Sequence, residues 1–192
     1  MAASFRTVIE VDPAYREQAQ EIDQVFQAAI APATVGYDFG HIREAVAAIP
    51  GGDIVKLVHG WGLQETAPVG VMAISLQEAV RQALPDALVG AAFWEAIERE
   101  LVGAFTGLDV QEGKPGLAFY EQAPGRTSYY RDLFFALQGE ETGEHMYAIA
   151  FCIDVSVALD KADVGVLTAS DVAQYAIRLN AIVVRQELRL AA

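Results

Sequence analysis

Residues 133–155, LFFALQGEETGEHMYAIAFCIDV, decide the fold. Two runs rich in aromatic and branched residues flank a short acidic turn, GEETGE. Runs of this kind around a glycine-containing connection predict a pair of antiparallel strands. Neither run alternates apolar with polar residues, as a strand with one face in water would. The stretch therefore predicts two central strands that are covered on both faces.

The two faces of the second strand differ in the size of their side chains. Along residues 145–159 the odd-numbered positions are bulky, for example Tyr147 and Phe151, whereas the even-numbered ones are mostly small, for example Ala148 and Cys152. Side chains alternate across a strand, so each class lies on its own face. A bulky face packs against one layer, and a small face lets a second layer approach closely. The pattern predicts a three-layer α-β-α sandwich, an α+β fold.

The remaining chain supplies the helices and the other strands. Apolar residues recur every three or four positions over residues 15–29 and 39–49, which predicts one helical hairpin. A second helix pair is expected over residues 71–84 and 86–108, with the break at Pro85. Strands are expected over residues 4–11, 53–62, 117–122, 127–138, 145–159, 164–169 and 172–184. We expect a largely antiparallel sheet wrapped by the two helical hairpins.

Composition limits the classes of function. The chain has 192 residues, enough for one domain over residues 1–192, and a net charge of −13. That charge argues against nucleic acid as a partner, because phosphate binding needs clustered Lys and Arg. It also disfavours capture by anionic lipid, whereas zwitterionic headgroups are compatible with it.

Other features bear on where the protein works. Cys152 is the only cysteine, so no intramolecular disulfide is expected. The first residues lack the basic and apolar regions of a Sec signal peptide. No apolar run reaches the length of a transmembrane helix. We expect a water-soluble native state.

The residues that suggest catalysis or metal binding have simpler interpretations. Asp38-Phe39-Gly40 matches a kinase triplet, but the other kinase motifs are missing. Cys152 with His59 or His145 and an aspartate would be a thiol triad, although a mid-strand cysteine is usually inert. The histidines lack metal-ligand spacing, and the acidic turn lacks the alternating ligands of a calcium loop. We expect neither an enzyme nor a cofactor.

Several segments, taken in order, resemble one family. They are ATVGYDFG at residues 33–40, LAFYEQAPGRTSYYRDLFFALQGEETGEHMYAIAFCIDVSVA at 117–158, and VGVLTASDVAQYAIRLNAIVV at 164–184. Their order and spacing resemble the Cyt family of bacterial cytolytic delta-endotoxins over about residues 5–184. The resemblance implies direct binding to membrane phospholipids, followed by permeabilisation through pores or through detergent-like disruption. The alternative is a non-lytic protein on the same fold that binds a lipid or acyl chain.

The resemblance also implies which parts act. The helical layers would swing away and the long strands would insert. Residues 127–138 would extend about 40 Å and residues 145–159 about 50 Å, whereas a tilted strand crosses hydrocarbon with about 9–11 residues. The acidic turn, with Glu140, Glu141 and Glu144, would resist crossing unless protonated. The expected insertion residues are Tyr129, Leu133, Phe134, Phe135, Leu137, Tyr147, Ile149, Phe151, Ile153 and Val155.

Further membrane contacts and partners are expected. Trp61, between two glycines at a strand end, is a candidate interfacial anchor. Arg126 and Arg131 are candidates for phosphate headgroups, with ordinary surface pairing as the alternative. The expected partners are membrane phospholipids, with a monomer or dimer in solution and a homo-oligomer on the membrane. The protein would be released without a Sec signal and act at a target-cell membrane.

Overall fold

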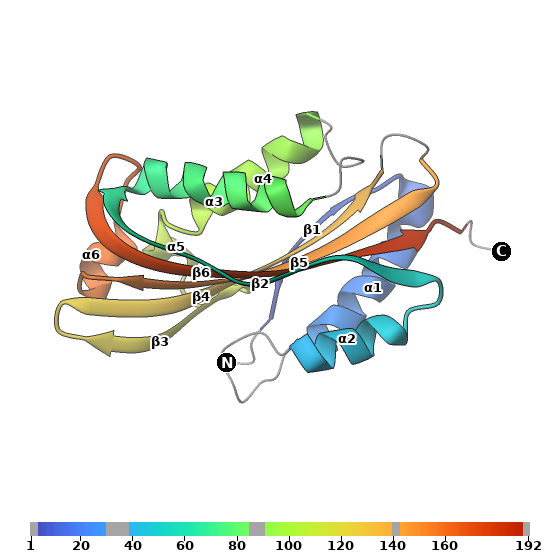
Figure 1. The fold of residues 1–192 in the computed structure, drawn as a ribbon, viewed down its shortest axis with the longest axis horizontal. Coiled ribbons are helices and arrows are strands. Elements are labelled where there is room, and N and C mark those ends of the chain that lie inside the picture. The colour runs from blue at the N-terminus through green and yellow to red at the C-terminus, as the bar shows by residue number, and fades with distance from the viewer. Residues whose placement is uncertain (1–3, 30–38, 85–90, 140–142, 190–192) are drawn as a thin grey trace.

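A six-stranded sheet forms the middle layer of the computed structural model, which describes residues 4–29, 39–84, 91–139 and 143–189 (Figure 1). The strand order is β1 (Arg6–Glu10), β4 (Arg126–Gln138), β5 (His145–Val157), β6 (Val172–Glu187) and β2 (Gly52–Pro68), and β3 (Leu117–Ala123) also pairs with β4. Among these described strands only the β1–β4 pairing is parallel. The prediction of a largely antiparallel sheet is confirmed.

Helices cover both faces of the sheet. The helices α1 (Arg16–Ala29) and α2 (Phe39–Ala47) lie on one face, preceded by the 3-10 turn η1 (Pro13–Tyr15). On the opposite face lie α3 (Val69–Ala83), α4 (Ala91–Gly103) and the short α5 (Leu108–Gln111), and α6 (Lys161–Gly165) connects β5 to β6 (Figure 1). This arrangement is the predicted α-β-α sandwich.

Two hydrophobic cores separate the layers, one on each face. Bulky sheet residues such as Phe135, Phe151 and Leu179 pack in one core with Leu76 of α3 and Leu101 of α4. We call this side of the sheet the bulky face. In the other core Phe134, Ala148 and Ala150 pack with Phe26 of α1 and Ile42 of α2, on what we call the small face. The size difference predicted for β5 is therefore confirmed.

The extent of several elements differs from prediction. Residues 164–169 were expected to form a strand, but α6 and a turn occupy this stretch. Val164 and Leu167, three positions apart, both face the bulky core, and an apolar spacing of three suits a helical turn as well as a short strand. β2 continues to Pro68 rather than ending at Gly62, because residues 61–68 stay in register with β6 apart from a bulge before Trp61.

Some expectations fall outside the described residues. These are the helix break at Pro85, most of the motif at residues 33–40, the start of the helix expected at residues 86–108, and Glu140 and Glu141 of the acidic turn. Within the described range that helix is divided into α4 and α5. Phe105 and Leu108, near the end of the expected range, are both buried.

Candidate functional site

The expected insertion residues all lie beneath helices. Phe134 lies on the small face, and the others lie on the bulky face: Tyr129, Leu133, Phe135, Leu137, Tyr147, Ile149, Phe151, Ile153 and Val155. None of the ten is more than 8% exposed. These side chains can therefore meet lipid only after a helical layer has moved.

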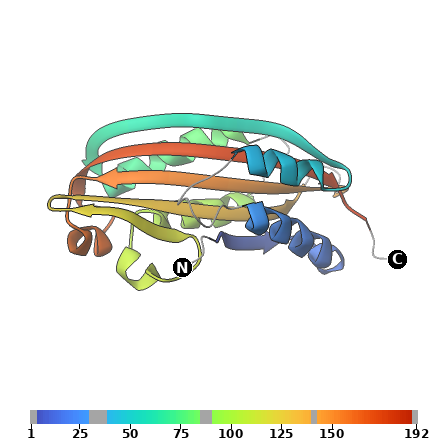
Figure 2. The ribbon, with the colours of Figure 1, turned by 90° about the horizontal axis from the view of Figure 1, so that it is seen from below.

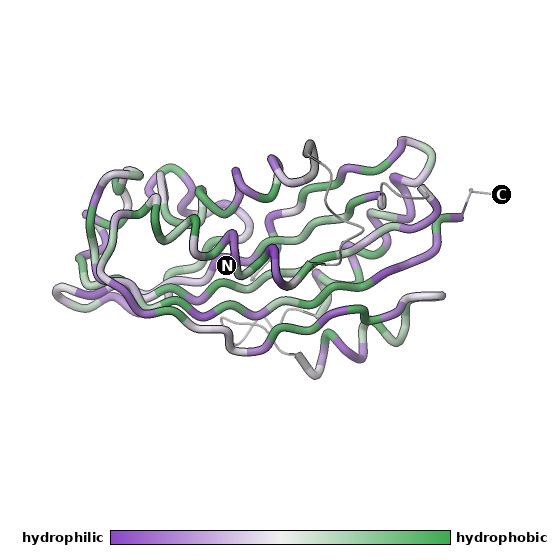
Figure 3. The backbone as a smooth tube through the Cα atoms, turned by 45° about the horizontal axis from the view of Figure 1, so that its top comes forward, coloured by the Kyte–Doolittle hydropathy of each residue, from purple (hydrophilic) through white to green (hydrophobic). Residues whose placement is uncertain are grey.

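The two faces of the sheet differ in how far their apolar surface extends along the strands. Each strand contains both hydrophilic and hydrophobic residues, as Figure 3 shows. The bulky face is apolar from the Tyr175 end of β6 to Val183. The small face is apolar only towards the hairpin end, where β4 approaches β5 through residues 139–144. Figure 2 shows α1 and α2 over that end of the strands alone. Towards the other end, which we call the far end, the small face is partly open to water.

Polar side chains occupy the open part of the small face. Tyr120 donates a 2.7 Å hydrogen bond from its hydroxyl to Asp154 Oδ1, and its ring stacks on that of Tyr130 with centroids 4.5 Å apart. Burial raises the pKa of Tyr120, and the bond to Asp154 raises it further. Arg178 lies opposite Asp154 on β6 and is exposed. This region is a hydrogen-bonded, water-facing surface.

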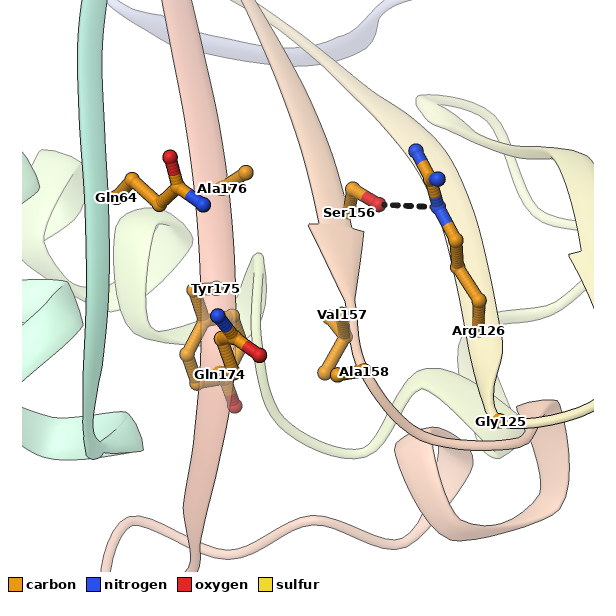
Figure 4. A pocket seen from close by; sticks show the side chains of 9 residues that line it. All are labelled: Gln64, Gly125, Arg126, Ser156, Val157, Ala158, Gln174, Tyr175 and Ala176. Atoms are coloured by element: carbon orange, nitrogen blue, oxygen red, sulfur yellow. Dashed lines mark hydrogen bonds between the residues drawn. The ribbon is translucent and has the colours of Figure 1, made fainter.

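A shallow cavity lies at the far end of the small face (Figure 4). Its volume is about 260 Å³, and it is lined by Gln64, Gly125, Arg126, Ser156, Val157, Ala158, Gln174, Tyr175 and Ala176. Arg126 Nε donates a 3.2 Å hydrogen bond to Ser156 Oγ and lies 3.7 Å from Glu121 Oε2. A second cavity of about 210 Å³ beside α1 is lined by Ala14, Glu17, Gln18, Glu21, Pro50, Gln186 and Arg189.

A buried charged cluster joins α4 to the sheet. Glu100 of α4 accepts a hydrogen bond of 2.9 Å at Oε1 from Arg6 Nη2 of β1, and its Oε2 lies 3.8 Å from Arg131 Nη2 of β4. Arg131 is 1% exposed and Glu100 is 7% exposed. Burial lowers the pKa of Arg131, whereas the nearby Glu100 carboxylate raises it. Arg131, expected at the surface, is instead a buried cation held under a helix, because odd-numbered residues of β4 face the bulky core.

Trp61 lies on the same face as Arg131. Its position in β2 pairs with Leu179, which pairs with Ile153, which pairs with Arg131, so the four residues form one cross-strand row. Trp61 is partly buried against the bulky core. The structure thus brings Arg131 and Trp61 to one face, whereas Arg126 lies on the opposite one with Ser156.

Cys152 is a buried thiol beside an aspartate. It is 1% exposed, on the small face, where it lies opposite Asp132 and Asn180. Burial raises the pKa of Cys152, and Asp132 raises it further, so the thiol stays protonated. His145, at the start of β5, lies seven positions from Cys152 along the strand.

Asp132 should make stability depend on pH. Burial raises its pKa to about 6, against 3.8 for the free side chain, although Cys152 and Arg131 favour the charged form. The protonated carboxyl therefore favours the fold below pH 4, and this contribution is lost as the pH rises through about 6. At pH 7.5 we expect the free energy of unfolding of Asp132→Asn to exceed that of the parent by about 1–2 kcal/mol. At pH 4 the two free energies should be almost equal. Thermal melts of both proteins at each pH would measure this; an equal gain at both pH values would contradict it.

Sequence reasoning missed Glu100, Arg6 and Asp132. Glu100 and Arg6 are 94 positions apart, and both are ordinary surface residues by type. A signal was available for Arg131: the alternation of β4 places it between Tyr129 and Leu133 on the bulky face. A cation at such a position requires an acidic partner from the covering layer.

No described helix is both long and apolar enough to cross a membrane. No group of three or more His, Cys, Asp or Glu side chains in the described ranges is placed to hold a metal ion.

The fold defines an α-β-α sandwich in which helices cover both faces of one long, largely apolar sheet. A family model described as Bacillus thuringiensis toxin matches residues 1–191, and the chain belongs to that family. It is 30% identical over 185 residues to the type-2Aa cytolytic delta-endotoxin of Bacillus thuringiensis subsp. kyushuensis, covering 96% of this chain and 71% of the relative. It is 27% identical to the type-2Bb cytolytic delta-endotoxin of subsp. jegathesan, covering 97% and 71%.

Solved structures agree with this assignment. A delta-endotoxin structure at 30% identity superposes with a TM-score of 0.92 over 98% of this chain and 83% of the other. The activated Cyt2Ba monomer from Bacillus thuringiensis subsp. israelensis, at 25% identity, also gives 0.92 over 97% and 100%. The resemblance to the Cyt family is therefore confirmed.

Proposed function

We propose that this protein is a cytolysin that binds phospholipid bilayers and permeabilises them after helices move off the sheet. The observation that carries the proposal is the long, apolar sheet surface sealed beneath helices. Strands of 13 residues in β4 and β5 and 16 in β6 exceed the usual five or six. Membership in a family with cytolytic members supports it. No catalytic step is part of this function.

Helix packing supports a movable cover. The contact of α3 and α4 with the sheet is mostly side-chain packing, with one charged cluster at Glu100 and a bond from the Tyr129 hydroxyl to the Ala104 carbonyl at 2.9 Å. Lipid chains can replace apolar packing at little cost, since both are apolar. We expect the protein to act at a target-cell membrane and to form homo-oligomers there.

Dye release from liposomes tests the function. We expect leakage at sub-micromolar protein from phosphatidylcholine vesicles, and less from anionic vesicles at pH 7.5, because the net charge of −13 opposes docking. At pH 5 the difference between the two lipids should shrink as carboxylates are protonated.

The matched control for catalysis is Cys152→Ala. It removes the single thiol and should leave release unchanged, whereas a thiol hydrolase would lose its activity. Binding to vesicles without leakage, at either pH and with or without protease treatment, would contradict the cytolysin and favour the non-lytic lipid-binding alternative.

A further inference from the structure

The faces of the sheet differ in what they could present to a bilayer. Along β4, β5 and β6 the bulky face is mainly apolar, with the buried charge Arg131 near its centre. The edge strand β2 adds Lys56, opposite Val183, and Glu65, opposite Tyr175, and both are exposed. The small face carries Tyr130, Asp154 and Arg178 beyond the edge of the α1–α2 layer. Burying those polar groups in hydrocarbon would leave them without water. The bulky face carries fewer such groups along its central strands, so it can lie against lipid chains with a smaller penalty.

We propose that α3–α5 form the cover that leaves and that the sheet then rests on the bilayer by its bulky face, while α1 and α2 stay in place. Arg131 and Arg6 then form the site for a lipid phosphate, which takes the position that the Glu100 carboxylate holds in the closed conformation. The proposal rests on the proposed function and adds to it the surface, the moving layer and the headgroup contact.

The charged cluster carries the headgroup part of this proposal. When α4 departs, Glu100 goes with it, and Arg131 is left on an apolar face without its anion. A guanidinium pairs with phosphate oxygens as readily as with a carboxylate, in the same forked geometry. Arg6 adds a second cation at the same point, with its side chain already 47% exposed. Trp61, in the cross-strand row of Arg131, suits the interfacial zone beside a headgroup.

Tryptophan depth measurements on opposite faces test which surface is bound. Trp94→Phe leaves Trp61 as the single tryptophan and reports on the bulky face. Trp61→Phe/Trp94→Phe/Tyr130→Trp places the single tryptophan on the small face, near the same level of the sheet. On phosphatidylcholine vesicles with brominated chains we expect at least twofold quenching of Trp61. Tyr130→Trp should instead respond to aqueous acrylamide alone.

The outcomes separate this proposal from the function itself. Dye release is recorded in the same samples, after melting curves confirm that both proteins are folded. Leakage with equal bromine quenching of both probes, or with none of either, would overturn the one-face arrangement and leave the cytolysin intact. Absence of leakage would overturn the proposed function and this inference with it.

A phosphate-free bilayer tests the headgroup contact. We expect the parent to bind phosphatidylcholine vesicles at least fivefold more tightly than vesicles of uncharged digalactosyl diacylglycerol. Arg131→Met/Glu100→Leu keeps a packed apolar pair in the closed fold and should lose this preference. Arg131→Lys should keep part of it, because the charge remains. A preference unchanged in the double variant would overturn the phosphate site, and inorganic phosphate that competes equally with lipid would show a free-anion site instead.

Discussion

Glu100→Gln should release dye from phosphatidylcholine vesicles about tenfold faster than the parent and should lower the melting temperature by about 5–10 °C. The substitution keeps the size of the side chain and removes the charge that faces Arg131 and Arg6. Arg131 then loses its ion pair at 3.8 Å and keeps only the longer-range interaction with Asp132 among the described carboxyl groups. Breaking a buried pair in this way costs about 3–5 kcal/mol.

Not all of that cost should appear, because Arg6 is half exposed and can be rehydrated. We expect about 2–4 kcal/mol of lost stability. If about 1.4 kcal/mol of this lowers the barrier to detachment of α4, release becomes tenfold faster. The rate of leakage at fixed protein and lipid measures the effect.

Glu98→Gln is the matched control on the same helix. Glu98 pairs with Arg81 at 3.8 Å, but both side chains are well exposed, so the loss should be below about 0.5 kcal/mol and the release rate should not change. If Glu100→Gln melts earlier but releases dye no faster, the cluster stabilises the fold without holding a cover closed. Glu100→Leu/Arg131→Met should recover most of the stability, since apolar residues replace the whole pair.

Leu63→Glu should reduce dye release about tenfold or more at pH 7.5. Leu63 lies on β2 opposite Ile177, on the bulky face, and is only partly buried, so the closed fold tolerates a polar side chain there. On the membrane the same carboxylate would face lipid chains, where a charge costs on the order of 1–3 kcal/mol. The ratio of dye release by the parent to release by the variant is measured from the fluorescence of the released dye across a protein titration.

The neighbouring residue provides the control. Gln64 pairs with Ala176 and lies on the small face, exposed beside the cavity in Figure 4. Gln64→Glu adds the same charge one position away, and we expect release within twofold of the parent. Release by Leu63→Glu should partly recover at pH 4, when the carboxyl is protonated. Equal inhibition by both substitutions would mean that both faces of the sheet enter the lipid.

Much of the fold could be predicted because it follows from local patterns. The alternation of bulky and small residues along β5 predicts two packing layers, and the three- and four-residue spacing in α1 predicts a helix that supplies one of them. These patterns are repeated over many residues, so one residue that departs from the pattern does not change the prediction. The stretch at residues 164–169 is too short for such averaging, and its spacing suited a helix and a strand equally.

The candidate site depended on pairings that no local pattern contains. By itself, the sequence determined the sandwich, the covered strands and the family, since these follow from periodicity and from the order of motifs along the chain. Only the tertiary structure decided that Arg131 meets Glu100 and Arg6, and that the small face is open at one end while the bulky face is sealed. The physical reason is that a charge in a core is stabilised by whichever distant residue the fold places beside it. Helix length and layer position, rather than the composition of any strand, set how much of each face is covered.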